Sequence, residues 1–391
     1  METSRLWTRD FVLAFGINLA MSLTFYLLMT SMAGYAIDRF GAGETVAGLA
    51  SSAYIIGALI ARIFAGKFLD FVGRKRMTLI SLVVFVLAAI AYIPLADVWS
   101  VIAVRFIHGL AFGAGNTAVQ ASVQMLIPQT RRAEGTGYFG TSTSLATAVG
   151  PFLAVYLTQH FGYSAMFWAS AAFSVFGLVL ALFIRLPERT PSADEQAAKW
   201  QLKLSSIIDY RALRISSIML LAGLAYANVL AFLTTWATEL GVPEAASWFF
   251  ILFAVVMLAS RLFVGRIQDR RGDNVVMYPI FFLFALSFVI IALAESGWAI
   301  VLAAVPMGLG FGSLFPCTQA IAVNVTSRER IGLAISTFFI MLDLGTGLGP
   351  VLLGAIVPLV GLQGLYLTCA GLVVLAGAVY HGVHGRVQSR P

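Results

Sequence analysis

Few charged residues lie inside the apolar stretches of this chain, and their chemistry is the most informative. Asp343 lies in the middle of one apolar run, Arg105 and His108 share another, and Glu134 stands at the start of a third. A charged side chain in hydrocarbon must be paired, neutralised or exposed to a wet cavity, and it is by default a functional candidate. Carboxylates and imidazoles also bind and release protons. Asp343, His108 and Glu134 are therefore candidates for proton coupling. A structural hydrogen bond between helices is the alternative for Asp343 and His108, and an ordinary solvated helix end is the alternative for Glu134.

The elements that position these residues follow from composition. Of 391 residues only 11% are charged and 60% are hydrophobic, with a mean hydropathy of +0.90. Soluble proteins carry about 25% charged residues, so a soluble fold is excluded. A helix needs about 20 apolar residues to cross a bilayer. The sequence predicts an all-α membrane protein with twelve transmembrane helices at 11–35, 46–65, 77–95, 99–126, 136–158, 164–186, 215–237, 246–264, 276–294, 298–322, 332–357 and 362–382.

The net charge of +7 is a topology signal. Cytoplasmic loops collect Lys and Arg, and a cytoplasmic N-terminus places 21 of the 25 basic residues on that side. The others are Arg39, in an outer loop, and Arg62, Arg105 and Arg261, in or at the ends of apolar runs. Both termini are therefore predicted to be cytoplasmic, in a multi-pass protein of the cell (inner) membrane. The same distribution argues against binding to nucleic acid.

The chain repeats itself at a shift of 199 residues. Asp70 matches Asp269, Gly109 matches Gly308, and Gly150-Pro151 matches Gly349-Pro350. We predict two homologous six-helix halves, at 1–186 and 214–391, joined by a cytoplasmic linker at 187–213. Because each half has an even number of spans, the repeats are parallel, an arrangement typical of transporters that alternate access to a central site. Duplicated bundles can also be channels or structural proteins.

The turn after the second apolar run has the pattern G-x-x-x-D-x-x-G-R-K. Its glycines permit a tight turn, and its carboxylate can accept hydrogen bonds from a cation or a helix N-terminus. This pattern resembles the loop 2–3 signature of the major facilitator superfamily, and a degenerate copy lies at the corresponding place in the second half. The resemblance covers essentially the whole chain and implies the two six-helix bundles of that superfamily. It assigns a gating role to Gly66, Asp70, Gly73, Arg74, Gly265 and Asp269.

Two further motifs resemble those of proton-linked members. Arg105-Phe106-Ile107-His108-Gly109 is similar to the span-four motif R-x-x-Q-G, with His108 in place of Gln, and this resemblance ties the Arg to proton transfer. Gly150 and Pro151 match the core of the antiporter signature, although its outer glycines are missing. A Pro inside a helix removes a hydrogen bond and bends the helix, so Gly150-Pro151 and Gly349-Pro350 are predicted kinks. The resemblance favours the drug:proton antiporter branch.

In this superfamily spans one, four, seven and ten line the central cavity. Amide side chains would suit a small organic solute, although hydrogen bonding between helices explains such residues equally well. We find no cluster of His, Cys and carboxylate with metal-ligand spacing, so neither a metal nor a cofactor is predicted. The candidate cavity residues are Asn18, Tyr26, Asn116, Gln120, Tyr226, Asn228 and Gln319.

The sequence therefore predicts a monomeric secondary transporter that exports a small organic molecule, such as a drug, a metabolite or an opine-type metallophore, in exchange for protons. Its partners are this substrate, protons and the lipid bilayer. The alternative on the same fold is a proton-coupled importer of a sugar or an organic acid. An intramembrane enzyme is disfavoured because the chain contains neither a His-Glu-x-x-His motif nor a Gly-x-Ser-x-Gly elbow, and a passive channel is disfavoured by the duplicated gating loops.

Overall fold

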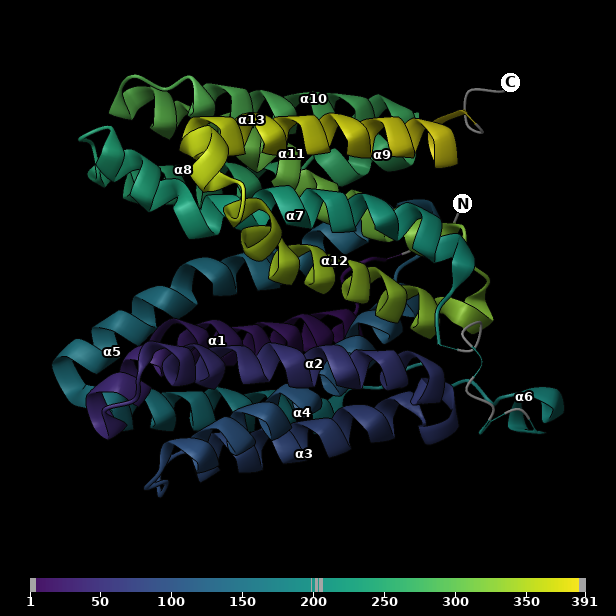
Figure 1. The fold of residues 1–391 in the computed structure, drawn as a ribbon. Helices are drawn as coiled ribbons and strands as arrows, with labels where there is room; N and C mark the ends of the chain where they lie inside the picture. Colours follow the sequence, from purple (N-terminus) through teal and green to yellow (C-terminus); the bar gives the residue numbers. More distant parts are fainter. Residues whose placement is uncertain (1–4, 198, 201–202, 204–206, 387–391) are drawn as a thin grey trace. The chain divides into compact units, whose positions relative to one another are not determined.

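The computed structural model describes residues 5–386, apart from 198, 201–202 and 204–206. In these residues all regular structure is helical (Figure 1). The α-helices are α1 (Arg9–Phe40), α2 (Glu44–Val72), α3 (Arg74–Ala91), α4 (Val98–Leu126), α5 (Arg132–Phe183), α6 (Ala193–Ala197), α7 (Tyr210–Glu239), α8 (Glu244–Ser260), α9 (Val264–Arg271), α10 (Asp273–Ala292), α11 (Gly297–Asn324), α12 (Ile331–Gly354) and α13 (Val357–Tyr380). Two 3-10 turns, η1 (Gln129–Arg131) and η3 (Arg328–Arg330), and a π-helical turn, η4 (His381–Gly385), complete the list.

The twelve predicted apolar ranges all lie largely within helices. Two of them fall in α5, which is interrupted at Gly162 with φ of +78°. Gly361, 199 residues later, has φ of +68° and interrupts α13 near its start. Nine helices in the described part of the chain are long and apolar enough to cross a membrane. The all-helical, multi-pass membrane fold is confirmed, and the count of twelve spans stays a prediction.

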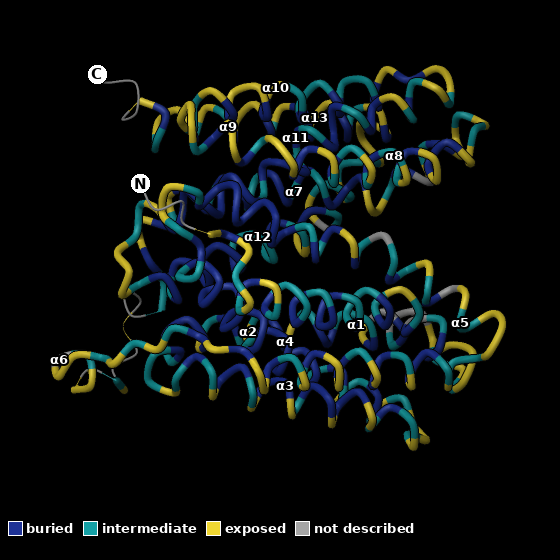
Figure 2. Tube along the Cα trace, turned by 180° about the vertical axis from the view of Figure 1, so that it is seen from behind, coloured by how far each residue is buried: buried dark blue, intermediate teal, exposed yellow. Residues whose placement is uncertain are grey.

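The helices form two compact units. Unit 1 comprises residues 1–128, 142–209 and 328–336, and unit 2 comprises 129–141, 210–327 and 337–391. In unit 1, α4 packs against α1, α2 and α3, and these helices run side by side in both views (Figures 1 and 2). In unit 2, α11 packs against α7, α8 and α10. The predicted halves therefore differ from the compact units mainly in two short segments, 129–141 and 328–336, each grouped with the helices of the other half.

Small residues explain why α2 and α4 approach so closely. A Cβ added to Gly109 would lie 2.0 Å from the carbonyl oxygen of Tyr54, and one added to Gly113 would lie 2.3 Å from that of Ala58. Backbone cannot move aside as a flexible side chain can, so only glycine fits at these two positions. The Gly109-x-x-x-Gly113 spacing thus places α4, which carries Arg105 and His108, directly against α2.

The outer face of α3 is apolar and exposed. Ile80, Val83 and Leu87 recur at helical spacing with 60%, 44% and 61% of their surface accessible, and exposed positions follow this face in Figure 2. The opposite face buries Phe85 and Leu82 against neighbouring helices. An exposed apolar stripe of this kind suits contact with lipid rather than water.

Candidate functional site

The turn between α2 and α3 is built around two glycines. A Cβ on Gly66 would lie 2.4 Å from Cβ of Ser336, at the start of α12, and Ser336 Oγ donates to the carbonyl oxygen of Arg62. Gly73 has φ of +93°, a conformation that favours glycine. The turn brings Asp70 to Arg74, whose Nε donates to Asp70 Oδ1 at 3.0 Å. The Arg74 side chain is buried and also donates to the carbonyl oxygen of Ala121, so the motif holds α2, α3 and α4 together.

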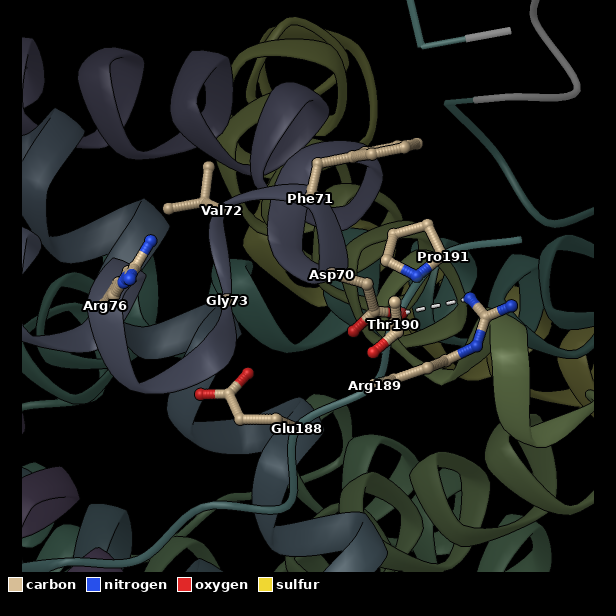
Figure 3. A pocket seen from close by; sticks show the side chains of 9 residues that line it. All are labelled: Asp70, Phe71, Val72, Gly73, Arg76, Glu188, Arg189, Thr190 and Pro191. Atoms are coloured by element: carbon tan, nitrogen blue, oxygen red, sulfur yellow. Dashed lines mark hydrogen bonds and ion pairs between the residues drawn. The ribbon is translucent and has the colours of Figure 1, made fainter. Parts of the chain in front are cut away.

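The linker contributes two residues to this turn that the sequence did not single out. Glu188 accepts hydrogen bonds from the backbone N–H groups of Arg74 and Lys75, both at 2.8 Å, and so caps the N-terminus of α3. Arg189 donates to Asp70 Oδ2 at 3.3 Å (Figure 3) and to the carbonyl oxygen of Glu329 at 3.2 Å. A pocket of about 340 Å³ lies among Asp70, Phe71, Val72, Gly73, Arg76, Glu188, Arg189, Thr190 and Pro191.

Arg189 is held in place from the linker side as well. It makes two hydrogen bonds of 2.8 Å to the carboxylate of Glu195. The Arg189 guanidinium lowers the pKa of Glu195, and the backbone N–H of Ser192 acts in the same direction. Arg189 therefore joins the linker, the α2–α3 turn and the segment before α12, all of which belong to unit 1.

The corresponding turn of the second half performs a similar task in unit 2. A Cβ on Gly265 would lie 2.5 Å from the carbonyl oxygen of Ala133, at the start of α5. Asp269 accepts hydrogen bonds from the backbone N–H groups of Ala133 and Glu134, at 3.0 and 2.8 Å. A carboxylate at this position satisfies amides that have no partner inside the helix and interacts favourably with the helix dipole. Gly265 and Asp269 thus attach the start of α5 to α9.

Glu134 is part of the same arrangement. Its carboxylate accepts hydrogen bonds from Arg131 at 2.7 Å and from Arg266 at 2.6 Å. Although burial raises the pKa of Glu134, the two guanidinium groups outweigh it, and the net pKa is lowered. A carboxylate engaged by two cations is stabilised in its charged form, so this geometry gives Glu134 a structural role in the conformation described.

Arg105 and His108 lie fully buried in α4 among aromatic rings. Arg105 donates to the carbonyl oxygens of Ala50 and Ser51 at 3.0 and 3.2 Å, and its guanidinium lies 4.7 Å from the ring centre of Tyr54. His108 Nδ1 is 3.1 Å from the hydroxyl oxygen of Tyr92. Among the described residues, Arg105 Nη1 and His108 Nε2 have no hydrogen-bond partner. The two residues lie one helical turn apart and share Tyr54 as a neighbour, since the ring centre of Tyr54 also lies 5.3 Å from that of His108.

Asp343 lies half-buried near the middle of α12.

The two Gly-Pro pairs lie where α5 packs against α1 and where α12 packs against α7. A Cβ on Gly150 would lie 2.6 Å from Cβ of Tyr26 in α1, and one on Gly349 would lie 2.6 Å from the carbonyl oxygen of Leu224 in α7. Both helices continue through Pro151 and Pro350.

Several candidate cavity residues are engaged inside their own unit. Asn18 Nδ2 donates to Ser142 and Thr143 at 2.7 and 2.9 Å, and Asn116 donates to Asn18 Oδ1 at 2.9 Å, so this buried cluster connects α1, α4 and α5. In unit 2, Asn228 donates to the carbonyl oxygen of Leu224 at 2.7 Å. Tyr226 stacks on Phe311 with ring centres 3.8 Å apart. Gln120 and Gln319 are buried, and Tyr26 is half-buried.

Sequence reasoning missed Glu188, Arg189 and Tyr92. The sequence did carry a signal for Glu188 and Arg189: they are an acid and a base directly after the last predicted span of the first half. At that point the chain re-enters the side of the membrane where the turn between α2 and α3 is also predicted to lie. No pattern in the sequence marked Tyr92, because it follows α3 in an apolar stretch and meets His108 only through the packing of α3 on α4.

The comparisons with known proteins agree with this architecture. The Staphylopine export protein of Staphylococcus aureus is 22% identical over 355 residues, covering 86% of both chains. The Uncharacterized MFS-type transporter YhhS of Escherichia coli K12 is 24% identical over 371 residues, covering 92% of this chain and 88% of that protein. The crystal structure of the human organic anion transporter MFSD10 (TETRAN) shares the fold with a TM-score of 0.81 at 18% identity, covering 95% of this chain and 98% of that one.

A bacterial homologue of the iron transporter ferroportin, in the outward-facing state, has a TM-score of 0.80 at 13% identity and covers 97% of this chain and 100% of that one. The profile of the Major Facilitator Superfamily matches residues 14–238 and again 215–390. This chain is a multi-pass membrane transporter and belongs to the Major Facilitator Superfamily.

Proposed function

We propose that this protein exports a small organic molecule in exchange for protons by alternating access. The observation that carries the proposal is the pair of repeat-related turns. Gly66 contacts the start of α12 within unit 1, and Gly265 contacts the start of α5 within unit 2. Asp269 adds hydrogen bonds to two α5 amides. The two turns thus occupy repeat-related places at helix ends, and we assign them the gating role in the transport cycle.

Proton coupling is assigned to Asp343, with Arg105 and His108 as a second candidate site. Asp343 lies near the middle of its helix, where a charged carboxylate costs much more energy than a protonated one. We propose that the bound proton and the bound substrate each lower this cost, so that the binding of one depends on the release of the other. Glu134 is the weaker candidate, because Arg131 and Arg266 already stabilise its charged form.

Export is favoured over import by two observations. The chain carries the Gly-Pro core of the antiporter signature in α5 and again in α12. A relative that aligns over 86% of this chain is an export protein, for staphylopine. Among organic solutes, those with amide, hydroxyl or carboxyl groups match the amide-bearing residues predicted to line the cavity.

Everted membrane vesicles distinguish export from import. Vesicles that contain the protein are acidified inside by respiration and observed with a pH-sensitive dye, while opines, sugars, amino acids and antibiotics are added one at a time. Antiport predicts proton release when substrate is added outside. A proton-coupled importer instead predicts release only from vesicles preloaded with substrate. Vesicles lacking the protein are the control, and the absence of any substrate-dependent release across the panel would contradict proton coupling.

A further inference from the structure

In each half, the end of the last helix or the segment that follows it is attached to the first turn of α3 or of α10. In unit 1, Lys75 Nζ donates to the carbonyl oxygens of Leu182 and Ile184, at the end of α5. In unit 2, Asn274 Nδ2 donates to the carbonyl oxygen of Gly385, at the end of η4, at 3.0 Å. Lys75 and Asn274 are repeat mates at the shift of 199 residues. We call these two attachments, together with the contacts that the same segments make to the first residue of α3 or of α10, the first and the second clasp.

The two clasps differ in the charged groups that they bring together. At the first position of α3 stands Arg74, and the approaching segment brings the carboxylate of Glu188 to its backbone N–H. At the first position of α10 stands Asp273, and the approaching segment brings His384, with Nε2 2.8 Å from Asp273 Oδ2. Carboxylate, ammonium and guanidinium groups keep their charge between pH 5 and 8, whereas an imidazole changes its charge in that range. The second clasp alone contains a histidine among these contacts.

The surroundings of His384 add no competing acid within hydrogen-bonding distance in the described residues. His381 pairs with the hydroxyl of Tyr278 at 2.7 Å, and the ring centre of Tyr380 lies 5.8 Å from that of His384. Tyr380 donates to Asn274 Oδ1 at 2.8 Å. The other charged residues near this segment lie in three places. They are Arg211 and Arg214 at the start of α7, which packs against η4, Asp269, Arg270 and Arg271 at the end of α9, which packs against α10, and Arg386 directly after η4.

The second clasp is connected to the start of α5 through side chains of unit 2. Asp273 Oδ1 accepts a hydrogen bond from Gln268 at 2.8 Å, and Gln268 also donates to the carbonyl oxygen of Cys317 in α11. The next residue, Asp269, receives the first amides of α5. The bond between His384 and Asp273 is therefore linked through Gln268 to its neighbour Asp269, which attaches α5 to α9.

We propose that the second clasp is a proton-sensitive switch. A protonated His384 forms an ion pair with the Asp273 carboxylate as well as a hydrogen bond to it. Deprotonation of His384 leaves the hydrogen bond from its ring N–H to the charged carboxylate but removes the attraction between opposite charges, and the segment 381–386 then opens more often. Acidification on the side predicted to be cytoplasmic thus stiffens the α9–α10 turn, and the first clasp stays unchanged.

Hydrogen–deuterium exchange of the purified full-length protein tests this proposal and needs no substrate. Labelling runs from pH 5.5 to 8, with labelling times scaled for the intrinsic pH dependence of amide exchange. After scaling, peptides covering 377–386 should exchange about three- to tenfold faster at pH 8 than at pH 5.5. Peptides covering 182–190, which report the first clasp in the same sample, should show no pH dependence.

The matched variant is His384→Gln, which keeps a hydrogen-bond donor but has no charge to lose. It should exchange at the same scaled rate across the range, close to the wild-type rate at pH 8. If the wild-type segment shows no pH dependence, or if His384→Gln retains the wild-type dependence, the proposal is overturned. Because the readout is local opening rather than transport, this result is independent of whether the proposed export activity is correct.

Discussion

At the scale of single residues, Asp343 decides the coupling proposal. We expect Asp343→Asn to reduce substrate-driven proton release at least tenfold, because an amide cannot take up and release the proton that the half-buried carboxylate of Asp343 exchanges. The measurement is dye dequenching in everted vesicles, with the amount of inserted protein matched by immunoblotting.

The control for this prediction is Asp38→Asn, the same chemical change at an exposed site. Asp38 lies near the end of α1, where it accepts a hydrogen bond from Tyr163 at 2.7 Å. It should retain near wild-type proton release. Unchanged coupling in Asp343→Asn would transfer the coupling role to Arg105 and His108.

The lowered pKa of Glu134 predicts that the stability of the folded protein depends on pH. Its folded pKa is lowered, since the hydrogen bonds from Arg131 and Arg266 outweigh the opposing effect of burial. Glu134 therefore stabilises the folded protein above its unfolded pKa of about 4.3, and this contribution is lost as the pH falls through the folded pKa. The apparent melting temperature should fall from about pH 5 downward, and Glu134→Gln should show a shallower fall. Glu239→Gln, an equal change at an exposed position, should follow the wild type; equal slopes for all three proteins would contradict the assignment.

At the scale of elements, the close approach of α2 and α4 predicts a large effect from one added methyl group. In Gly109→Ala the new Cβ would meet the carbonyl oxygen of Tyr54 at 2.0 Å, so the helices must separate. We expect a loss of about 2 kcal/mol or more and a lower melting temperature in detergent. Gly371→Ala in α13 is the matched control, because nothing lies within 4 Å of its Cβ; alanine there should be neutral or stabilise by about 0.5–1 kcal/mol. Equal melting temperatures for the two variants would contradict the packing argument.

At the scale of the whole molecule, the sequence predicted what depends on composition and on the repeat. The all-helical fold follows from composition, and the tight turn after α2 follows from the glycines of its motif. The partners of those residues do not, because Glu188 meets the N-terminus of α3 from more than 100 residues away. Asn18 illustrates the same limit: its amide type suits a substrate cavity, but only packing shows that Ser142, Thr143 and Asn116 already bind it.

The composition of unit 1 leads to a prediction about the chain as a whole. Residues 328–336 come from the second half of the sequence, yet they belong to unit 1, where Arg330 pairs with Asp209 and Ser336 covers Gly66. A fragment ending at residue 200 lacks this segment and exposes the glycine face of α2, so alone it should aggregate or elute as a broad peak in size-exclusion chromatography. Co-expression with a fragment beginning at residue 201 should restore a sharp peak at the position of the intact protein, since the missing segment is then supplied in trans. A sharp monomeric peak for the first fragment alone would contradict this prediction, because it would mean that residues 328–336 contribute little to the stability of unit 1.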